Sequence, residues 1–215
     1  MAIPTSELNF DRAVGYHYGQ FPPHDLNYAQ LINPLAKASE AIARFDQMLK
    51  NMHNSEILLT PLRNQEAVIS SRMEGTISTM DEILQYEADH TEGKENPDNT
   101  RMEVIETILY QRALKGAQQD MSEGRPLSQS LIKALHARLL SMGRGAEKSP
   151  GEYKKEQNYL VDKSKRNVLF VPVSPEKLID GLEDLFKYIK DDQQQLLIKA
   201  AITHVEFEAL HPFKD

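Results

Sequence analysis

The chain has 215 residues, of which 40% are hydrophobic and 27% are charged, a composition typical of a globular protein with a substantial core. Its net charge of −7 disfavours a nucleic-acid surface, and the absence of cysteine excludes disulfides and thiolate metal sites. The opening residues do not have the pattern of a secretory signal, and no run of about 18 apolar residues could span a membrane. We therefore expect a cytoplasmic protein.

Helical spacing dominates the first part of the chain. After a proline-rich opening, apolar residues predict a helix over about 27–52. We interpret its apolar stripe as core packing, with a dimer face, and hence a possible homodimer, as the alternative. Thr60-Pro61 predicts the start of the next helix, and Gly75 its end.

Further helix starts are marked by capping residues. Thr79 with Glu82, and Thr100 with Glu103, have the spacing of a capping box. Ser128 is in the position of an N-cap for a helix that would end near 143. A polar loop is expected between the two capping boxes, over 89–99.

The last third combines strands and helices. The stretch "NYLVDKSKRNVLFVPV" has two β-rich arms around a charged centre and predicts a β-hairpin. Ser174-Pro175 predicts another helix start, and a final helix should run from about Asp192 to Leu210. Seven or eight helices with one hairpin indicate an all-α fold that carries a small β flap.

Histidine and acidic residues that could act in catalysis or metal binding lie at the end of the final helix. His204, Glu208 and His211 are spaced to share one helical face, so they could bind a metal or simply serve the structure. Pro212 disfavours helical geometry at His211, which places this histidine on a turn. A histidine there, followed by the carboxylate of Asp215, suits base catalysis beside a divalent cation.

The segment "HVEFEALHPFKD" resembles the start of the Fic family signature, HPFx[D/E]GNGR, with the helix that precedes it. The resemblance implies an all-α fold that transfers AMP from ATP to a Ser, Thr or Tyr hydroxyl of a target protein. It implies that His211 is the catalytic base, that Phe213 anchors the loop in the core, and that Asp215 holds Mg²⁺. ATP and Mg²⁺ are then expected as substrate and cofactor, on condition that the motif is complete.

A second motif, "SSRMEG", is similar to the inhibitory motif [S/T]xxxE[G/N] of Fic proteins, with Ser70, Glu74 and Gly75 in its places. The resemblance implies auto-inhibition, in which Glu74 occupies the γ-phosphate position and pairs with an Arg beyond GNGR. Read from the residues alone, Glu74 would be an ordinary solvated helix end.

The predicted hairpin resembles the flap with which Fic proteins dock a target segment by strand-like pairing. An incidental hairpin packed on helices is the alternative. The docking residues would be Tyr159, Leu160, Val161, Leu169, Phe170 and Val171. The resemblance divides the chain into an N-terminal helical extension, 1–98, with the inhibitory helix at about 61–75, and a Fic core, 99–215, incomplete at its C-terminal end.

Gly-Asn-Gly-Arg, which follows the acidic residue in the family signature, does not occur in the printed sequence. Since this run supplies the phosphate-binding donors, we expect the 215 residues alone to be inactive or strongly impaired. The leading hypothesis is part of an auto-inhibited adenylyltransferase, with ATP and a target protein as partners. The alternatives are a Fic-like binding or regulatory module without catalysis, a relative that transfers phosphate or another group, and a metal hydrolase that uses His204, Glu208 and His211.

Overall fold

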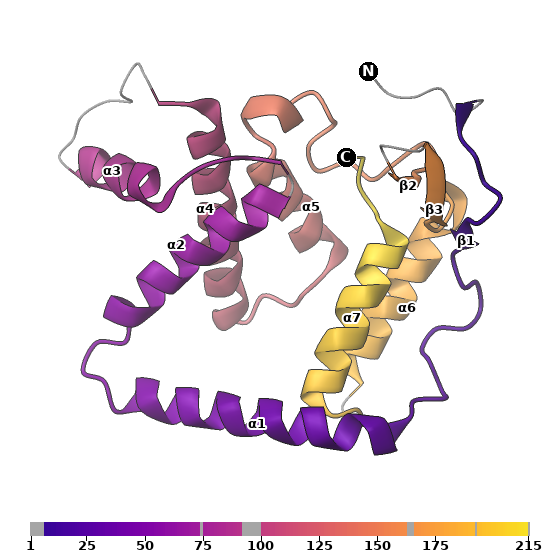
Figure 1. The fold of residues 1–215 in the computed structure, drawn as a ribbon, viewed down its shortest axis with the longest axis horizontal. Helices are drawn as coiled ribbons and strands as arrows, with labels where there is room; N and C mark the ends of the chain where they lie inside the picture. Colours follow the sequence, from indigo (N-terminus) through magenta and orange to yellow (C-terminus); the bar gives the residue numbers. More distant parts are fainter. Residues whose placement is uncertain (1–6, 74, 92–99, 163–165, 192, 215) are drawn as a thin grey trace. The chain divides into compact units, whose positions relative to one another are not determined.

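The computed structural model describes residues 7–73, 75–91, 100–162, 166–191 and 193–214, which form seven α-helices and a three-stranded sheet (Figure 1). The predicted class, a helical fold with a small β flap, is confirmed. The described residues form two compact units. The terminal unit joins the residues up to Ala41 to Tyr153–Lys214, and the middle unit is Ile42–Glu152. Among the described residues, no helix combines the length and apolar character needed to cross a membrane.

The middle unit is built on α4 (Met102–Ser122), which contacts α2 (Glu56–Met73), α3 (Met80–Thr91) and α5 (Gln129–Leu139). A short 3₁₀ turn, Gly143–Gly145, follows α5, so the predicted end of that helix near 143 is too late. Burial of apolar side chains from three helices provides the main stabilisation of this unit. One core cluster comprises Val68, Ile83, Tyr86, Val104 and Ile108.

The predicted start of α2 is wrong, because Pro61 lies inside the helix rather than at its first position. Proline has no N–H, so the carbonyl of Ile57 loses its helical donor. Ile57 is 72% exposed, and water can therefore replace that donor. The predicted end is confirmed. The N–H groups of Gly75 and Thr76 donate to the carbonyls of Arg72 and Ser71 over 3.0 and 2.9 Å, the pattern of a Schellman motif.

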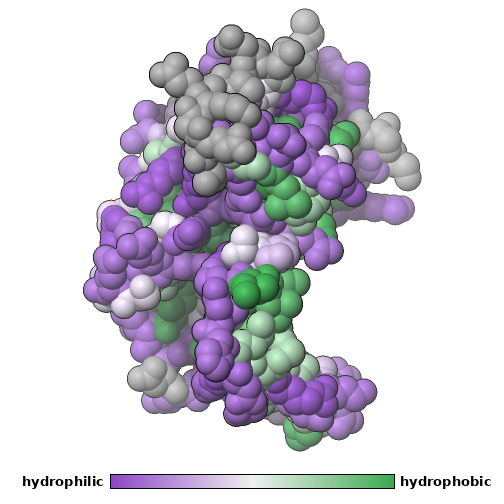
Figure 2. Space-filling model, turned by 90° about the vertical axis from the view of Figure 1, so that its left-hand side faces the viewer, coloured by the Kyte–Doolittle hydropathy of each residue, from purple (hydrophilic) through white to green (hydrophobic). Residues whose placement is uncertain are grey.

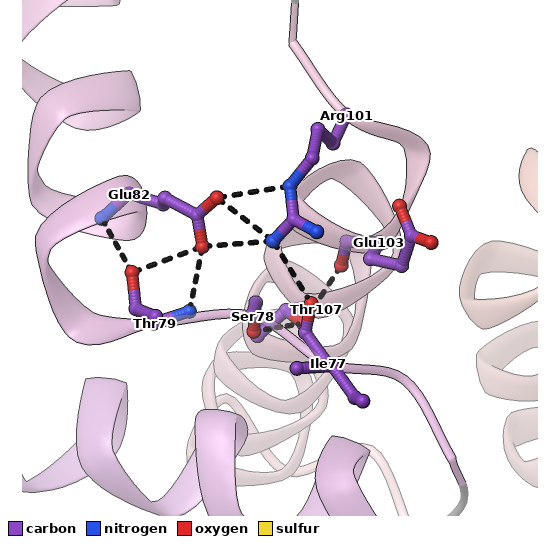
Figure 3. Close-up of polar contacts among 7 residues, drawn as sticks. All are labelled: Ile77, Ser78, Thr79, Glu82, Arg101, Glu103 and Thr107. Carbon is purple, nitrogen blue, oxygen red and sulfur yellow. Dashed lines mark hydrogen bonds and ion pairs between the residues drawn. The ribbon is translucent and has the colours of Figure 1, made fainter.

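One capping box is confirmed and the other is wrong. The Glu82 carboxylate accepts from the Thr79 N–H at 2.8 Å, and the Glu82 N–H donates to the Thr79 hydroxyl at 3.3 Å (Figure 3). At the start of α4, however, the N-cap is Arg101 and not Thr100, and no side chain caps the helix there. The guanidinium of Arg101 instead donates two 3.0 Å hydrogen bonds to Glu82, which ties the starts of α3 and α4 together.

In the terminal unit, α6 (Leu178–Lys190) packs against α7 (Leu196–Leu210), and a 3₁₀ turn, Pro175–Lys177, precedes α6. The final helix thus begins four residues later than predicted from Asp192 and ends where predicted. Its N-cap is Gln195, whose side chain accepts from the N–H groups of Leu197 and Ile198. The shared core comprises Val173, Leu178, Leu182, Leu185 and Leu210, of which the last is fully buried.

The predicted hairpin is present, and it carries a third strand that the sequence did not indicate. β2 (Leu160–Asp162) pairs antiparallel with β3 (Asn167–Val171), with an irregularity in register between Leu160 and Val161. The two-residue strand β1 (Val14–Gly15) pairs parallel with the other side of β3, so the strand order is β1-β3-β2.

The first helix, α1 (Tyr28–Lys50), matches the predicted range but not the predicted packing. None of its residues, all of which the structure describes, is buried. Ile42 and Phe45 of the predicted core stripe are 52% and 40% exposed. Figure 2 shows one face of the molecule, where hydrophobic side chains lie exposed among hydrophilic ones. The structure therefore gives no support to the interpretation of the α1 stripe as core packing, and the dimer face stays a prediction.

Candidate active site

His211 lies directly after α7, as predicted from the proline that follows it. Its backbone is in the left-handed region, with φ 44° and ψ 68°, and its N–H donates to the carbonyl of Phe207 at 2.9 Å. A residue other than glycine in this region costs free energy and persists only where its surroundings hold it. The neighbours of His211 along the chain, Leu210 and Pro212, are both buried. The half-buried histidine is thus presented on a turn with fixed flanks.

Lys154 bonds to the backbone on both sides of His211. Its ammonium group donates to the carbonyl of Leu210 at 2.9 Å, and its backbone N–H donates to the carbonyl of Pro212 at 2.8 Å. Lys154 is only 5% exposed. A cation at the C-terminal end of a helix interacts favourably with the helix dipole, and here it also satisfies a carbonyl that the helix leaves without a donor.

Phe213 is buried, as expected for an anchor. Its ring packs against that of Tyr153, with centroids 5.4 Å apart and planes inclined by 44°. Its carbonyl accepts a 2.7 Å hydrogen bond from the side-chain amide of Asn158. Burial raises the pKa of Tyr153 to about 12, so this phenol stays neutral at physiological pH. Residues 153–158, which we call the cradle, therefore hold the chain from Leu210 to Phe213.

A buried carboxylate on α7 connects this helix to the N-terminal segment. Glu206, whose side chain is 2% exposed, accepts a 2.6 Å hydrogen bond from the Tyr16 hydroxyl. Its other oxygen lies 2.7 Å from Nε2 of His17. The ring of His17 stacks on that of Tyr16, with centroids 4.4 Å apart. Burial, and then the hydrogen bond to Glu206, raises the pKa of Tyr16, which favours the neutral donor.

The flap residues lie where the hairpin prediction placed them. Tyr159 precedes β2 and packs its ring edge-on against Phe10, with centroids 5.3 Å apart. Leu160 of β2 and Leu169 of β3 are 58% and 50% exposed, whereas Val168, which directly precedes Leu169 in β3, is buried. Val161, Phe170 and Val171 are partly buried. Since β1 occupies one side of β3, the outer side of β2 is the edge at which, among the described residues, a further strand could extend the hairpin.

The end of the candidate inhibitory helix is fixed to α4 within the middle unit. Ser70 donates to Glu66 at 2.7 Å, and the Tyr110 hydroxyl of α4 donates to the same Glu66 oxygen at 2.8 Å. After the turn at Gly75, the Thr76 hydroxyl donates to Glu106 at 3.0 Å.

Two predicted site residues, Glu74 and Asp215, lie outside the described residues. Ser70 and Gly75 belong to the middle unit, whereas His211 and Phe213 belong to the terminal unit. The inhibitory role of Glu74 and the Mg²⁺-binding role of Asp215 therefore stay predictions.

The alternative metal site on α7 receives no support. His204 and Glu208 are exposed on this helix. Throughout the part of the chain that the structure describes, no three His, Cys, Asp or Glu side chains are arranged to hold a metal ion.

Sequence patterns missed the residues that support His211. Lys154 lies within a polar stretch, and nothing in "GEYKKEQ" distinguishes it from the exposed Lys155. Glu206 offered a weak signal, because an acidic residue on an apolar helix face must be paired when it is buried. Its partners, Tyr16 and His17, lie 190 and 189 residues earlier in the chain.

Comparisons with known proteins place this arrangement in a family. The "Fic/DOC family N-terminal" model matches residues 32–119, and the "Fic/DOC family" model matches residues 126–215. A Fic domain containing signaling protein from Bacteroides thetaiotaomicron has a similar structure at a TM-score of 0.55 and 21% identity, over 82% of this chain and 60% of that one. A Fic family protein from Desulfovibrio desulfuricans is similar at a TM-score of 0.61 and 20% identity, over 90% of this chain and 55% of that one. This chain thus spans less than two thirds of either solved structure. Because these two family models together match most of the sequence, the chain belongs to the Fic/DOC family.

Proposed function

We propose that this protein is an adenylyltransferase that moves AMP from ATP to a Ser, Thr or Tyr hydroxyl of a target protein. The observation that carries the proposal is His211, held in a left-handed turn at the end of α7 with its flanking carbonyls bonded to the cradle. A base on a turn with fixed flanks meets the geometric requirement for taking a proton from a docked hydroxyl.

In the proposed step, the target oxygen forms a bond to the α-phosphorus while the bond between the α- and β-phosphates breaks, and pyrophosphate leaves. His211 accepts the hydroxyl proton through its imidazole. Bound Mg²⁺ would neutralise charge on the phosphates. Asp215 is the proposed ligand for this ion.

The target segment would dock by adding a strand to the outer edge of β2. Strand addition uses main-chain hydrogen bonds and therefore tolerates many side chains. The other edge of the hairpin is already taken, because the Tyr16 N–H donates to the Val171 carbonyl at 2.9 Å. The exposed Leu160 would then contribute to side-chain selectivity at the open edge.

Auto-inhibition by Glu74 is the second part of the proposal. The residues around it are held to α4 by the bond from Tyr110 to Glu66 and by the bond from Thr76 to Glu106, which would keep the helix end in place. A carboxylate that competes with the ATP γ-phosphate for one guanidinium would block the productive pose.

The test uses ATP labelled at either the α- or the γ-phosphate, incubated with the protein at the length that its cell produces. Label from α-phosphate alone in protein bands supports AMP transfer, whereas label from γ-phosphate alone indicates phosphorylation. His211→Ala should abolish labelling. His204→Ala is the matched control, since this exposed histidine lies on the same helix. Equal loss in both variants would contradict the assignment of His211, rather than His204, as the base.

Inhibition is tested in the same assay with Glu74→Gly, which should increase self-labelling, and with Glu74→Gly combined with His211→Ala, which should eliminate it. An unchanged rate in Glu74→Gly would contradict the inhibitory role. The 215-residue chain, assayed in parallel, should label weakly, because the Gly-Asn-Gly-Arg phosphate donors are not among its residues. An absence of labelling in every form would favour a binding or regulatory module.

A further inference from the structure

The cradle contains a buried cation that the proposed reaction does not use. Lys154 is only 5% exposed. Its ammonium contacts a main-chain carbonyl of the residue directly before His211. Burying an ammonium is costly unless hydrogen bonds replace those it made to water. A residue maintained at such a cost at this position calls for a role connected to His211.

We propose that Lys154 is a positioning residue for His211. Its ammonium fixes the end of α7 so that the following residue keeps the left-handed conformation from which the imidazole acts. The catalytic part of this inference rests on the proposed adenylyltransferase function. The structural part does not.

The end of α7 shows why the ammonium is needed. The Phe207 carbonyl accepts a 2.9 Å hydrogen bond from the His211 N–H, and the Ala209 carbonyl accepts a 3.3 Å hydrogen bond from the Val173 N–H. The Leu210 carbonyl accepts a 2.9 Å hydrogen bond from the Lys154 ammonium. Leu210 itself is fully buried, so water cannot easily take the place of this donor.

The two bonds of Lys154 also restrict His211 from both sides. One bond acts before the histidine, at Leu210, and the other acts after it, at Pro212. The second bond comes from the backbone and survives any substitution of the side chain. Removing the ammonium therefore breaks the hydrogen bond to the Leu210 carbonyl and lets the turn relax towards a common conformation, while the loop stays attached at Pro212.

The first experiment needs no enzymatic activity. NMR spectra of the 215-residue chain report the imidazole signals of its seven histidines, and His211→Gln identifies the signal of His211. In Lys154→Met, we expect the His211 imidazole signals to shift and its amide proton to exchange faster, while the His204 signals stay in place. Lys154→Arg, which restores a cation with N–H donors, should return both properties towards those of the wild type.

Lys155→Met is the matched control, because this neighbouring lysine is exposed. It should leave the His211 signals unchanged. If Lys154→Met does not fold by circular dichroism, Lys154→Gln, which keeps a neutral N–H donor, takes its place in the same spectra. Folded variants whose His211 signals and amide exchange match the wild type would overturn the proposal.

The second experiment measures AMP transfer in the protein at its cellular length. Lys154→Met should lower kcat on the order of 100-fold with little change in the KM for ATP, as expected when a catalytic group is misplaced. A purely structural role would lower stability and leave the kcat of the folded enzyme unchanged, which would refute the proposal. If the wild type transfers no AMP, the proposed function fails, and the NMR result still decides whether Lys154 positions His211.

Discussion

The bond between Tyr16 and Glu206 offers a quantitative test of how the N-terminal segment is held on α7. A hydroxyl donates over 2.6 Å to a carboxylate whose side chain is 2% exposed. Hydrogen bonds to charged groups contribute about 1.5–3 kcal/mol to stability. We therefore expect Tyr16→Phe to lower the free energy of unfolding by about 2 kcal/mol. Glu206→Gln should cost about 1 kcal/mol, because its amide can still accept from Tyr16 but loses the charge.

The pairwise part is measured by a double-mutant cycle. Unfolding in urea, followed by far-UV circular dichroism, gives the free energy of each single variant and of the double variant. We expect a coupling energy of about 1 kcal/mol, since Tyr16 and Glu206 are in direct contact. Tyr28→Phe is the matched control. Tyr28 is 51% exposed, so its substitution should change stability by less than about 0.5 kcal/mol.

The same pair predicts a dependence on alkaline pH. The pKa of Tyr16 is raised, first by burial and then by the hydrogen bond to Glu206, so folding favours its neutral form. Its contribution is fully present below the unfolded value of 10.0 and is lost as pH rises towards the folded value. Stability should decrease above pH 10 less steeply in Tyr16→Phe than in the wild type. Additive free energies in the cycle, together with identical alkaline profiles, would refute the reasoning.

Three further predictions concern single residues. Hydrogen bonds from the N–H and hydroxyl of Thr79, and then the contact with Arg101, lower the pKa of Glu82. The contribution of this carboxylate to folding stability is therefore present above the unfolded pKa of 4.5 and is lost as pH falls through the folded pKa. Glu82→Gln should cost about 1 kcal/mol at neutral pH and reduce the loss of stability in acid, as measured by urea unfolding across that range. Gly75→Ala should cost about 1 kcal/mol in the same assay, because φ is +84° while nothing lies within 4 Å of the added Cβ; no loss would mean that the turn adjusts. Tyr153→Phe keeps the ring against the anchor and removes a phenol whose pKa is about 12, so alkaline difference spectra should lose one late-titrating tyrosine.

Local chemistry explains which elements could be predicted from the sequence. Ser128 caps α5 by accepting from the Leu131 N–H at 3.4 Å, and Thr79 with Glu82 completes a capping box. A cap involves residues only two or three positions apart, so its sequence signature and its geometry coincide. The turn at His211 belongs to the same class, because the proline that follows restricts it directly.

Contacts between distant residues explain the failures. The capping box expected at Thr100 does not form, and Arg101 instead bonds to Glu82 and to the carbonyl of Ile77, 24 residues earlier (Figure 3). Pro61 is tolerated inside α2, where an exposed turn lets water replace a lost donor. In both places the local rule is sound, and a feature of tertiary structure or solvent exposure outweighs it.

The strand β1 was not predicted from the sequence, and of the missed features it has the largest consequence for the site. Two residues, Val14 and Gly15, carry too little pattern to predict a strand, and their partners in β3, Phe170 and Val171, lie far away in the sequence. The nearby hydrogen bond from Asn9 to Asn167 spans a separation of 158 residues. Covering one side of β3 removes an edge that would otherwise pair with other chains.

The same N-terminal segment acts on two parts of the terminal unit at once. Its strand closes one edge of the flap, and the residues that follow, Tyr16 and His17, bond to Glu206 on α7. Glu206 lies in the last turns of α7, the helix that directly precedes His211. The proposed docking edge and the helix that presents the proposed base are therefore fixed to a common strap. A target strand added to β2 would meet a sheet whose other edge is already anchored, which lowers the conformational entropy lost when the target binds.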